Sequence, residues 1–186
     1  EIASTTNEML LSKYLLDKYK NDDKMRLYLL GEQVETIRTT IFRQTLFAEF
    51  EKKIHELVEK KEPLTAALFN KTYIDLVKKY YGPDFKIGEN DDIEWAYIPH
   101  FYWKFYVYSY AAGLASGITF SENIASSGQE GRDRYLNMLK APSTVKPLDV
   151  IKEAGVDLTK PNIVDAAAKL MDKAISEMEV IASRMK

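Results

Sequence analysis

Twelve residues in the middle of the chain gather side chains that could take part in chemistry. This aromatic segment, residues 99–110, carries one of the two histidines, His100, with one tryptophan and four tyrosines, among them Tyr102, Tyr106 and Tyr108. Phenol hydroxyls and an imidazole can donate hydrogen bonds to a polar ligand, while their rings line the pocket that holds it. The same composition is typical of an aromatic core helix, so the segment alone leaves both interpretations open.

The placement of these side chains depends on the helix that carries them. We expect one continuous helix through the segment, in which His100 and Tyr108 stand about 80° apart around the axis. Tyr102 and Tyr106 then belong to a second stripe on that helix. The small residues that follow, 111–117, indicate close helix packing and not chemistry.

Composition excludes several classes of function. The 186 residues are 46% hydrophobic and carry a formal charge of −2, which makes nucleic acid and anionic membrane poor partners. The absence of cysteine excludes disulfides and thiol catalysis, and together with the lack of a long apolar run it favours a cytoplasmic protein. The length fits one domain or a large piece of a bigger one.

Apolar residues recur at helical spacing along the whole chain, and no strand alternation appears. Helices are expected over residues 1–19, 24–60, 65–80, 99–126, 132–139, from 143 or 144 to 155, and from about 159 onward. Asp22 or Asp23 and Thr65 are the expected helix caps, and the polar face that includes Glu49 and Glu51 is typical of a solvated surface. The sequence therefore predicts an all-α array of about six to eight helices in a single piece over 1–186, with one long loop over about 82–98.

Most self-contained catalytic motifs are absent from these 186 residues. His55 and His100 are too far apart for an H-E-x-x-H zinc helix, and neither has a glutamate three residues before it as a di-iron bundle requires. Glycine-rich phosphate loops and Gly-x-Ser-x-Gly elbows are also missing. His55 lies among charged residues and is predicted to be a surface residue, while Arg43 is either a buried salt-bridge partner or an anchor for a substrate end.

Three stretches, in this order, resemble a known enzyme family. They are Glu-Ile-Ala-Ser-Thr-Thr-Asn-Glu at 1–8, Phe-Arg-Gln-Thr-Leu-Phe-Ala-Glu-Phe-Glu at 42–51, and Ile-Pro-His-Phe-Tyr at 98–102 followed by Phe-Tyr-Val-Tyr at 105–108. The chain resembles the oligoendopeptidase F group of thimet-oligopeptidase-like zinc metallopeptidases, over the C-terminal part of their larger helical catalytic domain. This resemblance covers nearly the whole chain and implies hydrolysis of short peptides.

The resemblance also implies roles for individual residues. Glu1 corresponds to a zinc ligand, and Glu8, which shares its helix face about 20° away and roughly 10 Å along, to a supporting carboxylate behind the metal. His100 and Tyr108 correspond to donors that stabilise the developing oxyanion, with Tyr106 the next candidate and Tyr102 a substrate contact.

The same resemblance predicts that these residues are insufficient for catalysis. The family's H-E-x-x-H helix supplies two zinc ligands and the general base, and this motif is absent from the sequence. Glu1 alone cannot hold zinc with useful affinity, so we expect the chain by itself to be inactive. Its first residue is Glu1 and not methionine, which leads us to expect that an upstream part of the same polypeptide supplies the missing groups.

Two other hypotheses stay open at this point. The chain could be a stand-alone α-helical module that binds a peptide in a tyrosine-rich groove, or a purely structural helical domain. An H-E-x-x-H motif upstream of Glu1 distinguishes the peptidase from both.

Overall fold

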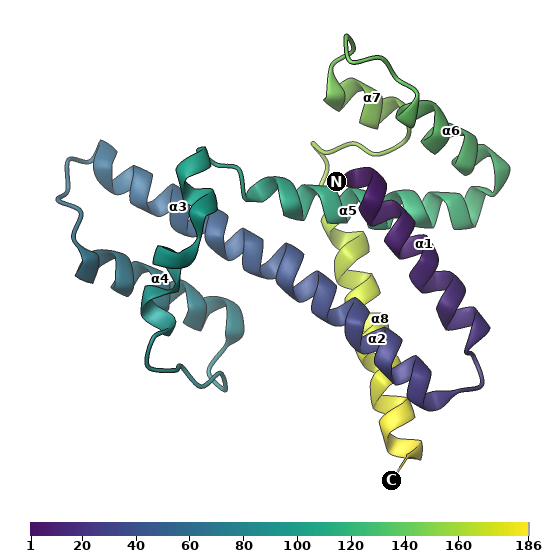
Figure 1. Ribbon diagram of the computed structural model, residues 1–186, viewed down its shortest axis with the longest axis horizontal. Coiled ribbons are helices and arrows are strands. Elements are labelled where there is room, and N and C mark those ends of the chain that lie inside the picture. Colours follow the sequence, from purple (N-terminus) through teal and green to yellow (C-terminus); the bar gives the residue numbers. More distant parts are fainter. Residues whose placement is uncertain (186) are drawn as a thin grey trace. The chain divides into compact units, whose positions relative to one another are not determined.

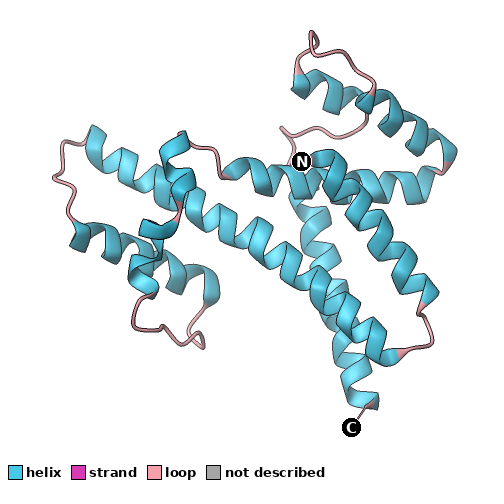
Figure 2. Cartoon of the chain, in the orientation of Figure 1, coloured by secondary structure: helices cyan, strands magenta, loops and turns pink. Residues whose placement is uncertain are grey.

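The computed structural model describes residues 1–185, and its regular structure consists of helices (Figure 2). The prediction of an all-α fold is confirmed, with eight α-helices and no strand among the described residues. In chain order the elements are α1 (Ile2–Lys18), α2 (Asp23–Ile37), η1 (Arg38–Phe42), α3 (Arg43–Glu59), α4 (Ala66–Tyr81), η2 (Asp91–Tyr97), η3 (Pro99–Trp103), α5 (Tyr108–Ser127), α6 (Gln129–Leu139), α7 (Pro147–Glu153) and α8 (Asn162–Arg184). Within residues 1–185, none of these helices combines the length and the apolar character needed to cross a membrane.

The chain divides into two compact units, which are described separately. Unit 1 contains Glu1–Arg38 and Ala112–Lys186, and unit 2 contains Thr39–Ala111. The expectation of a single domain stays a prediction.

Unit 1 is built around two helices that run side by side, α2 and α8 (Figure 1). Leu30 of α2 and Ala174 and Ile181 of α8 are buried between them. The apolar stripe predicted for the last helix is thus the face that packs, as expected for an amphipathic helix. Ion pairs join the same two helices at Arg26–Glu177 and Arg184–Asp23.

Helices α1 and α5 of unit 1 approach each other closely because small residues line the contact. A Cβ atom at Gly117 would lie 2.4 Å from Thr5 Oγ1 and 2.9 Å from the backbone nitrogen of Thr6. Thr5 also donates a hydrogen bond from Oγ1 to the Gly113 carbonyl at 3.3 Å. The small residues at 111–117 therefore serve helix packing, as predicted.

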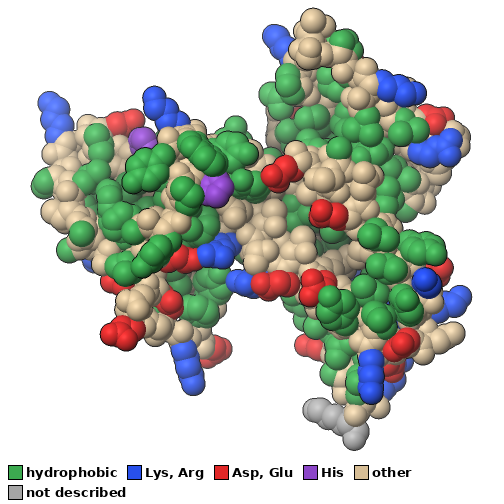
Figure 3. All heavy atoms as spheres, in the orientation of Figure 1, with side chains coloured by type: hydrophobic (Ala, Val, Ile, Leu, Met, Phe, Trp, Pro, Cys, Tyr) green, Lys and Arg blue, Asp and Glu red, His purple; other side chains and the backbone are tan. Residues whose placement is uncertain are grey.

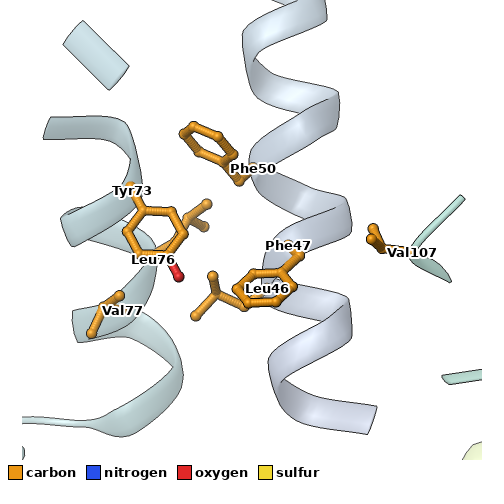
Figure 4. Close-up of a cluster of buried hydrophobic side chains, with 7 residues drawn as sticks. All are labelled: Leu46, Phe47, Phe50, Tyr73, Leu76, Val77 and Val107. Atoms are coloured by element: carbon orange, nitrogen blue, oxygen red, sulfur yellow. The ribbon is translucent and has the colours of Figure 1, made fainter. Parts of the chain in front are cut away.

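Unit 2 has an aromatic core between α3 and α4 (Figure 4). Both helices are amphipathic, and their apolar faces pack together. Thr65 caps α4, as predicted, by accepting a hydrogen bond from the Leu68 N–H at 3.2 Å. The buried side chains are Leu46, Phe47, Phe50, Tyr73, Leu76, Val77 and Val107. Val107 comes from the aromatic segment and lies against α3 (Figure 4), and Phe101 of the same segment packs on Phe47 and Phe50, so α3 supports the segment.

The structure differs from the predicted elements in two places outside the aromatic segment. The helix predicted over 24–60 is divided by the π-helical turn η1, which contains Thr39, Thr40 and Ile41 in succession. β-branched residues lose rotamer freedom in an α-helix, which favours a local departure there. Part of the loop predicted over 82–98 is the 3-10 helix η2, with three acidic residues in its first turn.

The continuous helix predicted from Pro99 is wrong. The chain instead forms η3, leaves helical geometry at 104–107, and begins α5 at Tyr108. Phe101 and Val107 both pack against the core of unit 2, whereas a continuous α-helix would turn them about 120° apart around its axis. Core packing of both residues therefore requires the break, at which Lys104 and Phe105 adopt positive φ angles of 36° and 54°.

Candidate functional site

His100 is fixed by its neighbour in η3. The ring of Phe101 packs against Phe47 and Phe50 of α3, with ring centroids 5.9 Å and 5.4 Å apart. His100 itself is half-buried. An aromatic anchor one residue away thus holds the imidazole at a defined position on unit 2.

Three aromatic rings surround the imidazole of His100. Their centroids lie 5.0 Å away for Trp103, 6.1 Å for Tyr106 and 5.8 Å for Tyr110. The ring of Tyr106 also meets Trp103 and Tyr110 edge to face, each at 5.4 Å. We call these four residues the His100 cluster. Figure 3 shows hydrophobic side chains gathered around the histidines on the visible face of this unit.

The other two tyrosines predicted as site residues are more exposed. Tyr108, the first residue of α5, is 61% exposed, and Tyr102 in η3 is 88% exposed. Tyr102 borders an apolar hollow of about 280 Å³, whose other walls include Phe50, Phe69 and Trp95. The break at 104–107 thus brings His100 and Tyr106 together and leaves Tyr102 beside a separate hollow.

Glu51, which we predicted to lie on a solvated face, is buried beside this break. Glu51 of α3 has an exposure of 0%, and its Oε1 accepts a hydrogen bond from the backbone N–H of Phe105 at 2.6 Å. Its Oε2 is buried and has no hydrogen-bond partner among the described residues. The available clue was that Glu51 follows Phe50 and lies one turn after Phe47 on the apolar stripe of α3.

His55, one turn further along α3, is exposed as predicted. Its ring nevertheless packs on the ring of Phe105, with centroids 4.7 Å apart. The turn at Lys104 and Phe105 is therefore contacted by two residues of the same helix, Glu51 and His55.

Arg43 forms a salt bridge, as one of its two predicted roles requires, but its side chain is 37% exposed and not buried. Its guanidinium forms an ion pair with Glu94 of η2 and lies 5.2 Å from the ring centroid of Phe47. The hydroxyl of Tyr73 donates a hydrogen bond to the same Glu94 carboxylate. Burial raises the pKa of Tyr73, so its hydroxyl stays protonated and able to donate.

Glu1 and Glu8 belong to unit 1, and both are exposed. The turn that carries Glu1 is held from two directions, since Thr5 donates to the Gly113 carbonyl and the Tyr135 hydroxyl donates to the Ala3 carbonyl at 3.1 Å. The start of α1 is therefore well anchored on α5 and α6.

The described residues do not form a metal centre by themselves. Across 1–185, no three histidine, cysteine, aspartate or glutamate side chains are grouped so that they could hold a metal ion. Glu1 offers one carboxylate, while a zinc site takes three or four protein ligands. The residues of this chain alone thus do not fit the zinc ion that the resemblance implies.

Comparison with known proteins decides the family. The family model described as peptidase family M3 matches residues 1–170. The chain belongs to peptidase family M3. This M3 chain is 46% identical, over all of its 186 residues, to the oligopeptidase PepF of Bacillus subtilis strain 168, of which it covers 28%. It is 43% identical over 184 residues to the chromosomal oligoendopeptidase F of Lactococcus lactis subsp. cremoris, of which it covers 30%.

The fold of the chain also matches solved structures. The M3 chain matches the crystal structure of oligoendopeptidase-F from Enterococcus faecium with a TM-score of 0.94 and 38% identity, over 99% of this chain and 35% of that one. A putative peptidase from Chlamydophila abortus matches with a TM-score of 0.89 and 37% identity, over 97% of this chain and 30% of that one. The M3 chain thus spans less than a third of the length of the curated relatives described above.

Proposed function

We propose that this chain is the C-terminal portion of a zinc-dependent oligopeptidase that hydrolyses peptide bonds in short peptides, and that the 186 residues alone are inactive. The observation that carries the proposal is the match to peptidase family M3 over residues 1–170. It is supported by relatives that are named oligopeptidases or oligoendopeptidases and are more than three times as long as this chain. Family membership favours this proposal over a stand-alone binding module.

In this proposal, the aromatic segment supplies hydrogen-bond donors to the carbonyl oxygen of the scissile peptide bond. As the carbonyl carbon becomes tetrahedral, negative charge develops on that oxygen, and donors placed there stabilise the transition state more than the substrate. His100 and Tyr108 are the proposed donors, with Tyr106 as the alternative. The rings around His100 limit its motion, and the exposure of Tyr108 leaves its hydroxyl accessible to a peptide.

Tyr102 is proposed to contact the substrate. It stands beside the apolar hollow of about 280 Å³ on unit 2, which has the lining expected of a pocket for an apolar side chain. Short peptides are therefore the proposed partners, together with the remaining part of the same polypeptide.

One zinc ion is the proposed cofactor of the whole polypeptide. Glu1 is the ligand that this chain would contribute, and Glu8 the carboxylate that would support it. The remaining ligands and the general base must come from residues outside these 186, because the described residues do not form a metal centre. We further propose that the protein is cytoplasmic.

The donor assignment is tested by substitution in the full-length polypeptide. His100→Phe keeps the ring packing but removes the donor, and Tyr108→Phe removes only a hydroxyl. Each is expected to lower kcat for peptide hydrolysis by about 10²- to 10³-fold. Tyr97→Phe is the matched control, because Tyr97 is also an exposed tyrosine, at 74%, and lies outside the aromatic segment. Turnover within about twofold of wild type for His100→Phe would refute its role.

A further inference from the structure

The carboxyl group of Glu51 is buried, which is energetically unfavourable for an ionisable side chain. Its side chain is fully buried on the helix that also carries Phe47 and Phe50, and its Oε2 has no partner among the residues described. Burying an ionisable group in an aromatic core is unfavourable unless a hydrogen bond compensates it. In this structure the compensation is the 2.6 Å hydrogen bond that the Phe105 N–H donates to Oε1.

The N–H that donates to Glu51 belongs to a turn in which two consecutive residues have positive φ angles. Lys104 and Phe105 both have positive φ angles, 36° and 54°, which residues with a Cβ adopt reluctantly. The N–H of Phe105 lies outside helical geometry and has no helical carbonyl as its partner, and a side-chain carboxylate accepts from it instead, in a part-buried hydrogen bond. That carboxylate is Glu51, whose Oε1 lies 2.6 Å from the nitrogen of Phe105.

The turn is connected to α3 at three points. Glu51 accepts from the backbone of Phe105, His55 packs on its ring, and Val107 is 1% exposed in the core. Tyr106 lies between Phe105 and Val107, and its ring contacts the imidazole of His100, with centroids 6.1 Å apart. The two rings are stacked, with an interplanar angle of 15°.

We propose that Glu51 is a positioning residue, which holds the Lys104–Phe105 turn and thereby sets the arrangement of the His100 cluster and the start of α5. This inference rests on the proposed function, because it assigns Glu51 a part in arranging the proposed oxyanion donors. Glu51 does not touch the substrate in this account. Its effect passes through the backbone of Phe105.

The first part of the test measures the turn itself in the 186-residue chain. Amide hydrogen exchange of Phe105, followed by NMR, is expected to be slow in the wild type and in Glu51→Gln, whose amide oxygen can still accept the bond. In Glu51→Leu the exchange should become at least roughly tenfold faster, while amides of α8 in unit 1 keep their wild-type rates. If Glu51→Leu does not fold, Glu51→Asp draws the carboxylate back by one methylene and should show the same loss. A Phe105 amide that stays protected in both variants overturns the proposal.

The second part measures hydrolysis by the full-length polypeptide. Glu51→Leu, or Glu51→Asp in its place, should lower kcat at least roughly tenfold with KM within about threefold, because misplaced donors weaken transition-state binding more than substrate binding. Glu51→Gln should stay within about threefold of wild type in both constants. Glu49→Leu is the matched control, since it removes a carboxylate two residues away on the same helix, and its kcat should be unchanged.

Measuring His100→Phe alongside distinguishes a failure of the proposed function from a failure of the inference about Glu51. If His100→Phe leaves turnover unchanged, the proposed function of the aromatic segment fails, and the catalytic role of Glu51 falls with it. If His100→Phe lowers turnover but the Glu51 variant that lost Phe105 protection turns over peptide at the wild-type rate, only the inference about Glu51 is overturned.

Discussion

Residues of the same type on one helix have opposite surroundings in this structure. Glu51 is buried and holds a backbone N–H, whereas Glu49, two positions earlier on α3, accepts hydrogen bonds from Lys79 and Tyr80 at the surface. The sequence assigned both to one solvated polar face, because a carboxylate is almost always exposed. The difference arises from the break at 104–107, which no local pattern in the sequence indicates.

The surroundings of Glu49 lead to a prediction about pH. Hydrogen bonding from Lys79, followed by Tyr80 and Lys53, holds the pKa of Glu49 below its ordinary value of 4.5. A carboxyl with a lowered pKa in the folded state stabilises the fold fully above its unfolded pKa, and this stabilisation is lost as the pH falls through the folded pKa. Its contribution is therefore present at pH 7 and disappears below about pH 4.5.

The test is urea unfolding of Glu49→Gln beside the wild type. At pH 7 the variant should lose about 0.5–1 kcal/mol of unfolding free energy, a value suited to a partly exposed ion pair. The difference should shrink as the pH is lowered below about 4.5. An equal difference at pH 7 and pH 3 would show that Glu49 acts by packing and not by charge.

Several candidate site residues could be named from the sequence, but their arrangement could not. His100 and Tyr106 were predicted as site residues, and the structure places their rings together. The predicted stripe of Tyr102 with Tyr106 does not form, because the chain leaves helical geometry between them. That break is set by long-range packing of Phe101 and Val107 on α3, which a single sequence does not reveal.

The elements of unit 1 show how small residues fix the distance between helices. The start of α1 rests on α5 where Gly117 leaves room for Thr5 and Thr6. Glu1, the proposed metal ligand, lies at this end of α1, so its position depends on that close approach. The presence of these helices was predictable from the spacing of apolar residues, and close packing at the small residues from their composition. The break before Tyr108 was not, because Pro99 is equally suited to start an α-helix or a 3-10 turn.

The helix contact is tested by Gly117→Ala. The added methyl group would meet Thr5 Oγ1 at 2.4 Å, so α1 must shift, and overpacking of this kind typically costs about 1–3 kcal/mol. Gly31→Ala is the matched control, because a Cβ there meets only the flexible end of Met178 at 3.9 Å. In the interior of α2 that change should stabilise the chain by roughly 0.5–1 kcal/mol. Urea unfolding that gives both variants the same sign would contradict this account of α1 and α5.

The chain belongs to peptidase family M3 and spans 28–30% of the length of the two curated relatives described above. All the chemistry proposed for it lies in two sets of residues, the carboxylates of α1 in unit 1 and the aromatic segment of unit 2. Neither set contains the nucleophile-activating base or enough ligands for zinc. In our proposal, the catalytic groups are therefore divided between these 186 residues and the rest of the polypeptide.

Peptide hydrolysis and zinc content of the 186-residue chain, measured beside the full-length polypeptide, test this division most directly. The full-length polypeptide is expected to bind about one zinc ion and to cleave short peptides, because in our proposal it supplies all the ligands that a zinc site requires. The 186-residue chain should bind no zinc in stoichiometric amount and show no hydrolysis above background. Zinc-dependent hydrolysis by the 186-residue chain alone would contradict the account.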